Sequence, residues 1–330
     1  MANKLVEIVA ENACKLQGRE AYRFCWRKDG EWLSTSWEEF AVQVDVAAKA
    51  LAMLGLIEKD TVAICSPNTP QILITEFGAF KNRLACIPIY SSSSQAQYDF
   101  IVSDGGASVL FVGDSHQYPL AYNHWKSHPD KIRKIVIFKN DGLDLREDDT
   151  VSIFWDDFVR LGMNATEETA REVERRASGG LPEDMATLIY TSGTTGEPKG
   201  VVITHGNYDA AIEMHLEMLT TISDDDLSMA FLPMSHILEK AWCFFCISRG
   251  LAVAVNYDPR LIQDTIHEVH PNLMCCVPRF WEKVYAGVKE KIAAMSPMQR
   301  TLVNRAISVG RRRNLHYRRR GKRAPWYVEK

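Results

Sequence analysis

The 330-residue chain is 46% hydrophobic and 25% charged, as soluble globular proteins are, and its net charge of −3 gives no global reason to expect nucleic-acid binding. The charge is uneven, because eight basic residues and no acidic residue lie from Arg311 to Arg323, so the rest of the chain carries −11. The length allows two domain-sized units or one large one.

Neither a signal peptide nor a membrane span is predicted. The start of the chain mixes Lys4 and Glu7 with apolar residues, unlike a secretory leader. The longest apolar run, Ala241 to Tyr257, is interrupted by Arg249 and is too short to cross a bilayer.

The eight cysteines follow no regular framework, which indicates reduced thiols in a cytoplasmic protein. Cys243 and Cys246, together with the adjacent Cys275 and Cys276, are the only spacing that suggests zinc. Bulky apolar neighbours surround the first two, and adjacent cysteines rarely bind one ion. We therefore expect these thiols in the core rather than at a metal site.

Residues 1–60 predict a helix, two short strands and a second helix. Ala21–Trp26 alternates like a strand, a turn follows at Lys28-Asp-Gly, and Glu31–Thr35 resumes the pairing. Ser36-Trp-Glu-Glu39 is a capping box that begins the second helix.

From Thr61 onward, strands alternate with helices. The pattern predicts helices over Ile72–Phe80 and Gln95–Ser103, and strands over Thr61–Cys65, Ala85–Tyr90, Ser108–Val112 and Ile132–Phe138. This alternation predicts an α/β fold with a parallel sheet covered on both faces. The charged segments 140–150 and 164–180 are expected to be loops or surface helices.

A loop rich in glycine and hydroxyl side chains follows the strand-like segment Met185–Tyr190. Its glycines let backbone N–H groups approach an anion, its hydroxyls donate to phosphate oxygens, and Lys199 supplies a positive charge. The end of a strand is also where α/β proteins bind ligands. This composition predicts a polyphosphate site. It is not a Walker A loop, because Gly200 and an apolar run follow the lysine.

The remaining chain repeats the alternation before it becomes helical. A helix is predicted over Asn207–Leu219, followed by an acidic turn and a strand that ends at Leu232-Pro233. Strands over Leu251–Val255 and Leu273–Val277 flank a helix near Pro259–Val269. Ser296-Pro-Met-Gln299 is another helix start.

Several of these motifs resemble one family. Tyr190–Val201 matches, almost completely over twelve residues, the signature loop of the adenylate-forming acyl-CoA synthetase superfamily, which includes firefly luciferase and the adenylation domains of peptide synthetases. Leu232–Lys240 resembles a second family motif in its long-chain version, in which Glu and a basic residue follow a His. Val277–Tyr285 is similar to a segment common in long-chain fatty acid–CoA ligases, and Ile87–Tyr90 and the loop Ser91–Ser94 agree with that subgroup.

The resemblance implies the N-terminal region of the adenylate-forming fold, with two β-sheet subdomains layered with helices. Residues 45–220 are expected to form the first α/β subdomain, which ends with the phosphate-binding loop 190–200. Residues 1–44 are expected to join the second subdomain, and residues 221–330 to form an incomplete part of it. The exposed apolar surface of an incomplete subdomain leads us to expect association, for example as a homodimer.

The resemblance also implies two half-reactions. A fatty acid carboxylate attacks ATP to give acyl-AMP and diphosphate, and the thiol of coenzyme A then displaces AMP. ATP, Mg²⁺ and coenzyme A are the implied cofactors and substrates. Thr191 matches a nucleotide-binding position linked to Mg²⁺, and the residues that match phosphate-holding positions are Ser192, Gly193, Thr194, Thr195, Gly196 and Lys199.

The second motif supplies two substrate-binding candidates. His236 matches the family residue near the acyl carboxylate, whereas a lone His among apolar residues is more often a core group. Glu239 lies three residues on, where a helix would let it orient His236, and a solvated carboxylate at a helix start is the alternative. His205 is interpreted as a helix-entry residue.

The basic run Arg311–Arg323 has three interpretations: a solvated helix face, a peripheral contact with anionic lipid headgroups, and, least favoured, a nucleic-acid site. No nucleic-acid partner is expected.

The expected function is therefore that of a long-chain fatty acid–CoA ligase, of which this chain is the N-terminal portion and inactive alone. The family's Tyr-Gly-x-Thr-Glu motif and the catalytic lysine of its mobile C-terminal domain do not occur in these 330 residues, so no catalytic residue is assigned within them. An aryl-CoA ligase, a peptide-synthetase adenylation domain and a stand-alone, non-catalytic nucleotide- or acyl-binding module are the alternatives.

Overall fold

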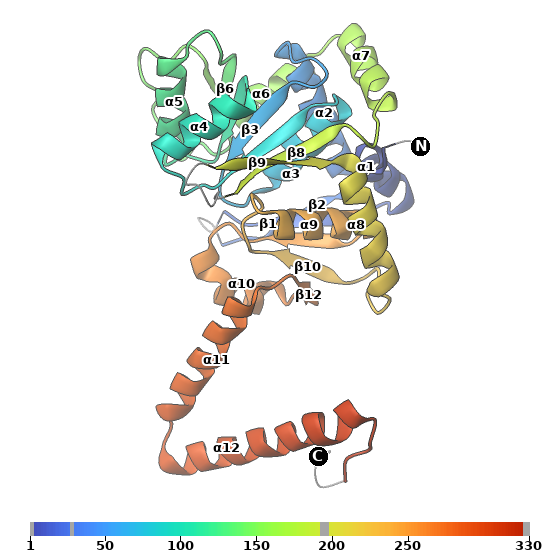
Figure 1. Ribbon diagram of the computed structural model, residues 1–330, viewed down its shortest axis with the longest axis vertical. Coiled ribbons are helices and arrows are strands. Elements are labelled where there is room, and N and C mark those ends of the chain that lie inside the picture. The colour runs from blue at the N-terminus through green and yellow to red at the C-terminus, as the bar shows by residue number, and fades with distance from the viewer. Residues whose placement is uncertain (1–2, 27–29, 192–197, 326–330) are drawn as a thin grey trace. The chain divides into compact units, whose positions relative to one another are not determined.

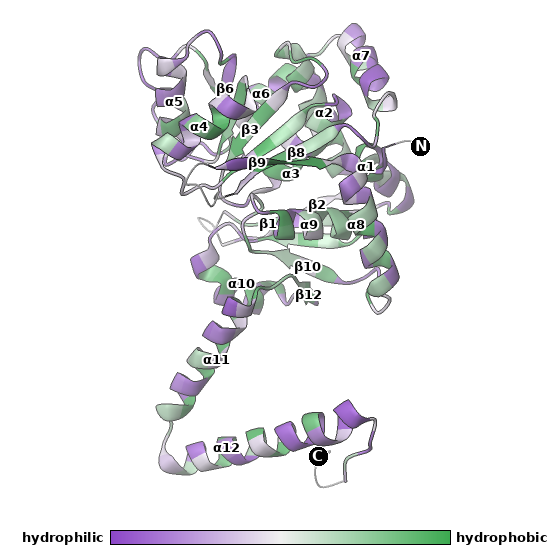
Figure 2. Ribbon diagram, in the orientation of Figure 1, coloured by the Kyte–Doolittle hydropathy of each residue, from purple (hydrophilic) through white to green (hydrophobic). Residues whose placement is uncertain are grey.

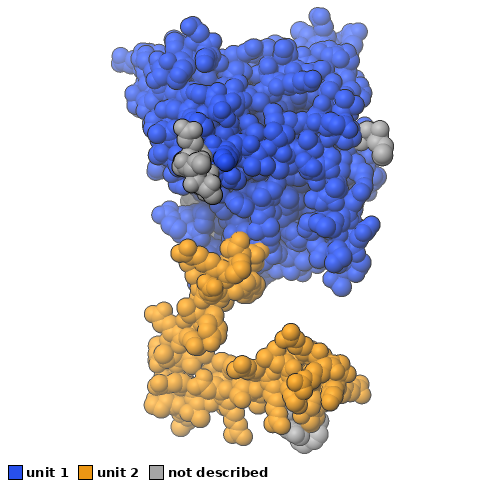
Figure 3. All heavy atoms as spheres, viewed as in Figure 1, with its two compact units in different colours: residues 1–275 blue, residues 276–330 orange. Residues whose placement is uncertain are grey.

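The computed structural model describes residues 3–26, 30–191 and 198–325. The chain divides into two compact units, Met1–Cys275 and Cys276–Lys330, which Figure 3 shows in different colours. Both sheets lie in the first unit.

The larger sheet has seven strands in the order β7-β6-β5-β3-β4-β8-β9 (Figure 1). All neighbours are parallel except β8 and β9, which form an antiparallel pair at one edge. The strands are β3 (Thr61–Cys65), β4 (Ala85–Ile89), β5 (Val109–Val112), β6 (Lys134–Ile137), β7 (Ser152–Phe154), β8 (Met185–Thr191) and β9 (Lys199–Thr204).

Helices cover both faces of this sheet, so its central strands β3 and β4 are buried at every position. On one face, Phe77 and Phe158 join the same apolar core as Trp37. On the other, Tyr98 and Trp125 pack in a second core. The helices of the first face are α2 (Trp37–Met53), α3 (Pro70–Lys81) and α6 (Trp155–Met163), and those of the second are α4 (Gln95–Gly105) and α5 (Tyr118–Ser127). α7 (Glu167–Ser178) contacts α2 and α3.

The smaller sheet has five strands in the order β12-β10-β11-β1-β2. The N-terminal strand β1 runs parallel to β11, so residues more than two hundred positions apart are neighbours, with Tyr22 opposite Val253. The strands are β1 (Glu20–Phe24), β2 (Leu33–Ser36), β10 (Leu227–Ala230), β11 (Ala252–Val255) and β12 (Leu273–Met274). The accompanying helices are α1 (Lys4–Lys15), α8 (His205–Met218), α9 (Ile237–Arg249) and α10 (Ile262–Val269), the last preceded by a 3₁₀ turn, Pro259–Leu261.

Helices α3, α8 and α9 pack together between the two sheets (Figure 1). The Phe244 ring on α9 lies 5.3 Å from Phe77 and 4.9 Å from Tyr208, measured between ring centroids. In the same layer, the ammonium group of Lys240 on α9 donates to the carboxylate of Glu76 on α3, and both side chains are 1% exposed. An aromatic cluster and a buried ion pair thus join the two subdomains.

The α/β fold with a parallel sheet covered on both faces is confirmed. The capping boxes at Ser36 and Ser296 are also confirmed, since each side chain accepts from the backbone N–H three residues on. The predicted end of the strand at Leu232-Pro233 is wrong. β10 ends at Ala230, because the Leu232 carbonyl and the Met234 amide bond to the side chain of Asn68 instead of extending the ladder.

The second unit contains α11 (Pro278–Ala293) and α12 (Pro297–Arg311), followed by a π turn (Arg312–Tyr317) and a 3₁₀ turn (Arg318–Arg320). Polar and apolar residues alternate along these helices, whereas the strands of both sheets are largely hydrophobic (Figure 2). Large apolar side chains are exposed on them, including Trp281, Tyr285, Met298 and Leu302. Among the described residues, none of the helices has the length and apolarity that crossing a bilayer requires.

Removing one partner of the buried ion pair should destabilise the first unit strongly. Lys240→Met leaves the Glu76 carboxylate without its counter-charge, and such a loss costs about 3–5 kcal/mol. The double variant Glu76→Met/Lys240→Met removes both charges and should recover most of that loss. Urea unfolding followed by circular dichroism measures both effects. A loss in the double variant equal to the sum of the losses in Lys240→Met and Glu76→Met would show that the charges do not interact.

Candidate functional site

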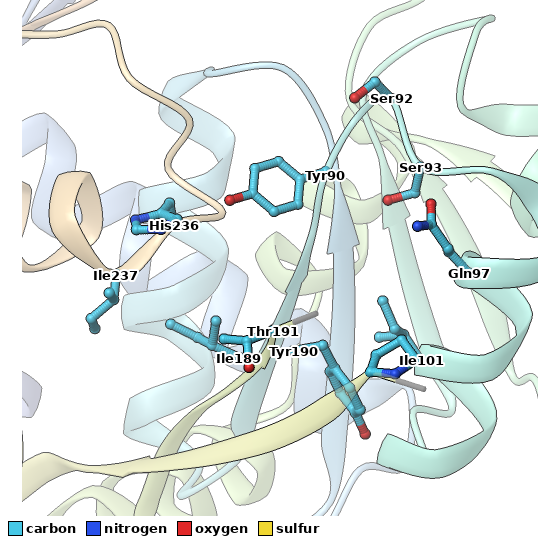
Figure 4. A pocket seen from close by; sticks show the side chains of 11 residues that line it. Tyr90, Ser92, Ser93, Gln97, Ile101, Ile189, Tyr190, Thr191, His236 and Ile237 are labelled. Atoms are coloured by element: carbon cyan, nitrogen blue, oxygen red, sulfur yellow. The ribbon is translucent and has the colours of Figure 1, made fainter. Parts of the chain in front are cut away.

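A cavity of about 500 Å³ lies where β4 and β8 end and α9 begins (Figure 4). β4 and β8 are parallel neighbours, so their carboxyl ends meet at one edge of the sheet. The lining comes from the segment after β4, from α4, from the end of β8 and from the start of α9: Tyr90, Ser92, Ser93, Gln97, Ile101, Ile189, Tyr190, Thr191, Pro198, His236 and Ile237.

The predicted phosphate-binding loop connects the two strands of a hairpin. Thr191 at the end of β8 pairs with Lys199 at the start of β9. Directly paired residues project from the same face of a sheet, so the Lys199 side chain leaves the hairpin on the face that carries the Thr191 hydroxyl. Both residues are exposed. The other predicted loop residues lie outside the described residues: Ser192, Gly193, Thr194, Thr195 and Gly196.

Tyr190 joins the hairpin to helix α4. Its hydroxyl donates to Asp104 at the end of α4 over 2.5 Å, and burial together with this carboxylate raises the pKa of Tyr190. Opposite Tyr190 stands Gly200, where a Cβ would lie 3.1 Å from Leu188 Cδ1 and 3.3 Å from Tyr190 Cζ. Glycine therefore lets β9 approach the Tyr190 ring.

His236 is the N-cap residue of α9, and its exposed ring lines the cavity. Its Nδ1 accepts from the backbone N–H of Leu238 over 3.3 Å. Because Nδ1 accepts, the neutral ring carries its proton on Nε2, which is then a donor. Figure 4 shows the Tyr90 hydroxyl on the His236 side of the cavity. His236 and Thr191, 45 positions apart in sequence, thus share one cavity.

Glu239 does not line this cavity. The side chain is buried, with 0% exposure, so the interpretation as a solvated carboxylate is wrong. Burial raises the pKa of Glu239 to about 8 from 4.5, and the backbone amides of Phe231 and Leu232 oppose the rise. Neither carboxylate oxygen reaches a partner at hydrogen-bond geometry among the described residues. A group with this pKa is largely protonated, and therefore neutral, at pH 7.

His205 begins α8, as predicted. It is 1% exposed, and its ring packs edge-on against Phe80 with 4.8 Å between centroids. Burial lowers the pKa of His205 to about 4, and the nearby Asp184 opposes the shift. Its role is to pack in the helical layer. Cys243 and Cys246 are likewise buried in the apolar core, where we predicted them, whereas Cys275 and Cys276 are half-buried.

Sequence reasoning did not assign the polar wall formed by Tyr90, Ser92, Ser93 and Gln97. The signal was present, because Tyr90 and then a run of four serines follow the buried strand β4. Strand ends at the carboxyl edge of a parallel sheet are where ligands bind. Ser94 also caps α4, which fixes the position of this wall.

The chemistry of the lining suits an anion with an apolar part. Among the described residues that line the cavity, hydroxyls, one carboxamide and one imidazole can donate hydrogen bonds, and none carries a carboxylate. Ile101, Ile189 and Ile237 supply apolar surface. A carboxylate or phosphate can therefore enter without facing a like charge.

Comparison with known proteins adds a family. The AMP-binding enzyme family matches residues 9–320. A long-chain-fatty-acid–CoA ligase of Gallus gallus is 28% identical over 96% of this chain and 41% of its own length. Long chain acyl-CoA synthetase 1 of Arabidopsis thaliana is 26% identical over 84% of this chain and 42% of its own length. The chain thus spans about two fifths of the length of the curated relatives it matches.

Solved structures share the fold. The o-succinylbenzoate CoA synthetase of Bacillus subtilis, solved with its acyl-adenylate intermediate, superposes with a TM-score of 0.65 at 20% identity, over 85% of this chain and 50% of that one.

The protonation of Glu239 should make stability depend on pH. A carboxyl whose pKa is raised in the folded state stabilises that state below the unfolded pKa, and the contribution is lost as pH rises from about 4.5 through about 8. Glu239→Gln keeps the shape without titrating. Its stability relative to the unmutated protein should therefore increase from pH 5 to pH 9 in urea unfolding. A difference that stays constant over this range would contradict the assignment.

Proposed function

Because the chain belongs to the AMP-binding enzyme family, we propose that it contributes the phosphate-binding hairpin and part of the acyl site to a long-chain fatty acid–CoA ligase. The reaction converts ATP, a fatty acid and coenzyme A into acyl-CoA, AMP and diphosphate through acyl-AMP. The observation that carries the proposal is the shared cavity, in which the end of the signature hairpin and His236 meet.

The residues around the cavity have separate roles in this proposal. Lys199 neutralises phosphate charge, and the loop residues 192–196 donate hydrogen bonds to phosphate oxygens. The Nε2–H of His236 donates to the acyl carboxylate. Thr191 offers a hydroxyl oxygen, a ligand type that Mg²⁺ accepts, at the face where Lys199 also projects. When bound, Mg²⁺ would offset the charge of the phosphates. Joining an anion to a polyanion needs such neutralisation and positioning above all.

The preference for long-chain acids rests on the relatives, since several of them carry that activity in their names. An aryl-CoA ligase or a peptide-synthetase adenylation domain is the alternative substrate class, and a non-catalytic nucleotide- or acyl-binding module the alternative to an enzyme. We also propose that residues 1–330 alone ligate slowly or not at all, because no lysine of the family's C-terminal type occurs among them.

We further propose that the second unit contacts anionic membrane surfaces. Residues 276–330 contain 15 basic and 3 acidic residues, against 24 and 39 in residues 1–275. Exposed Trp281, Tyr285, Met298 and Leu302 add the apolar side chains that insert at a lipid interface. Basic charge combined with such side chains favours lipid over nucleic acid.

The function is tested by diphosphate release from ATP in the presence of acids from butyrate to stearate, with a protein that contains this chain and the segments its relatives add. Lys199→Ala should raise the KM for ATP about tenfold or more, because a charged hydrogen bond to phosphate is lost, and should leave the KM for the acid unchanged. Lys131→Ala, which removes an exposed charge that does not line the cavity, is the control. An ATP dependence that is the same in all three proteins would contradict the hairpin assignment.

The membrane contact is tested by co-sedimentation of the chain with vesicles of phosphatidylcholine alone or mixed with phosphatidylserine. Arg318→Gln/Arg319→Gln/Arg320→Gln should weaken binding to the mixed vesicles by about tenfold or more, since each basic residue near the surface contributes about 1 kcal/mol. Lys283→Gln/Lys289→Gln/Lys291→Gln on α11 removes the same charge elsewhere and should weaken binding less. Equal losses would indicate a general charge effect.

A further inference from the structure

The loop that carries His236 is anchored by a side chain from the other subdomain. This His236 loop, residues 231–236, connects β10 with α9. Asn68, from the segment between β3 and α3, donates through Nδ2 to the carbonyl of Leu232 over 2.8 Å. Its Oδ1 accepts from the backbone N–H of Met234 over 2.9 Å. One carboxamide is therefore hydrogen-bonded to the loop on both sides of Pro233.

These two hydrogen bonds require a side chain with a donor and an acceptor, such as a carboxamide. Leu232 offers an acceptor and Met234 a donor, while Pro233 between them has no N–H to offer. Only a side chain with a donor and an acceptor side by side satisfies both, as a neighbouring peptide strand would. Asn68 is 6% exposed and Met234 is 1% exposed, so water does not readily replace either bond.

The loop transmits this anchoring to the imidazole. The His236 backbone N–H donates to the Pro233 carbonyl over 2.9 Å, and the His236 carbonyl accepts from Lys240 over 3.1 Å. Pro233 lies between the two residues that Asn68 contacts, and it is hydrogen-bonded to His236. His236 is in turn hydrogen-bonded to the backbone of Lys240, which forms the buried ion pair. A continuous series of hydrogen bonds therefore leads from Asn68, near the end of β3, to the residue whose ring lines the cavity.

We propose that Asn68 is a positioning residue for His236, which it holds at the cavity by fixing the His236 loop against the larger sheet. The proposal rests on the function proposed above, because it assigns the site that receives the acyl carboxylate. Asn68 acts through His236, since it does not itself line the cavity.

Asn82 provides a matched control. It is also a buried asparagine whose carboxamide bridges backbone from two elements, with Nδ2 donating to the carbonyls of Ala48 over 2.8 Å and Gly78 over 3.2 Å. These backbone partners lie on α2 and α3, and the Asn82 Oδ1 accepts from Arg176 on α7 over 3.2 Å. None of these residues lines the cavity. Asn82→Ala should therefore cost stability as Asn68→Ala does, without moving His236.

The test compares Asn68→Ala, Asn82→Ala and the unmutated sequence, each in a protein that contains this chain and the segments its relatives add, by two measurements. The first is the imidazole NMR signal of His236, assigned by its loss in His236→Gln. The second is calorimetric binding of a non-hydrolysable fatty acyl sulfamoyl-adenosine, which mimics acyl-AMP. We expect Asn68→Ala to shift or broaden the His236 signal and to weaken binding about tenfold. Asn82→Ala should change neither.

Asn68→Asp separates positioning from general destabilisation. Its ionised carboxylate cannot donate to Leu232, but the protonated acid has the shape of the amide and restores both bonds. Burial against a carbonyl raises the pKa of such an acid. The His236 signal and the analogue affinity of Asn68→Asp should therefore return toward those of the unmutated protein, measured at the same pH, as pH falls from about 8 to about 6. Asn68→Ala should show no such return.

The outcomes distinguish the two proposals. If the unmutated protein with the added segments does not bind the analogue, the measurement counts against the proposed function, while the His236 signal still tests the anchoring. If the analogue binds and Asn68→Ala changes neither measurement, the positioning role is wrong. Should Asn68→Ala not fold, the pH dependence of Asn68→Asp decides. If the His236 signal of Asn68→Asp changes with pH only as much as that of the unmutated protein, the proposal is wrong.

Discussion

The buried contact between α3 and α9 determines where the cavity forms. Each sheet buries its own core, but the segments that line the cavity belong to both subdomains: β4 and β8 end at the larger sheet, and α9 follows β10 of the smaller one. The Glu76–Lys240 pair and the ring of Phe244 against Phe77 hold α9 against α3. Because unpaired buried charges cost several kcal/mol, α9 has few alternative positions along α3. The N-terminus of α9, and with it His236, is therefore placed opposite the hairpin.

The same helix keeps the cavity free of negative charge. Two acids, Glu76 on α3 and Glu239 on α9, are buried near a single buried base, Lys240, which pairs with Glu76. Glu239 has no base at hydrogen-bond distance among the described residues, and burial raises its pKa to about 8, so the proton stays on the acid at pH 7. At pH 7 Glu239 thus adds no negative charge near His236, three positions before it in the sequence. Residues 1–275 are acidic overall, with 39 acidic against 24 basic residues, and this net negative charge repels an anionic ligand. A neutral Glu239 avoids adding to that repulsion near the cavity.

Local signals in the sequence predicted most of the larger subdomain. Thr61–Cys65 and its neighbours were found because buried parallel strands are short apolar runs, and the helix at Ser36 because its capping box is local. The amphipathic segments Tyr118–Ser127 and Trp155–Met163 were missed, since aromatic and polar residues are mixed in them. The pairing of β1 with β11, and the burial of Glu239, depend on contacts between distant segments that no local pattern encodes. Thr191 and His236 were found through motifs, and the structure brings them to one cavity.

Asn68 shows why a positioning residue is harder to find than a ligand-binding one. In the sequence it stands in Pro67-Asn-Thr-Pro70, where asparagine has a sufficient local explanation as a turn residue. Its partners are 164 and 166 positions away, and they are backbone atoms, so the identities of Leu232 and Met234 carry no trace of the contact. The visible consequence is the early end of β10, where two backbone groups leave the ladder to meet a side chain. In this protein the apolar sequence continues past the end of β10, and the backbone groups beyond the strand bond to Asn68, in the segment between β3 and α3.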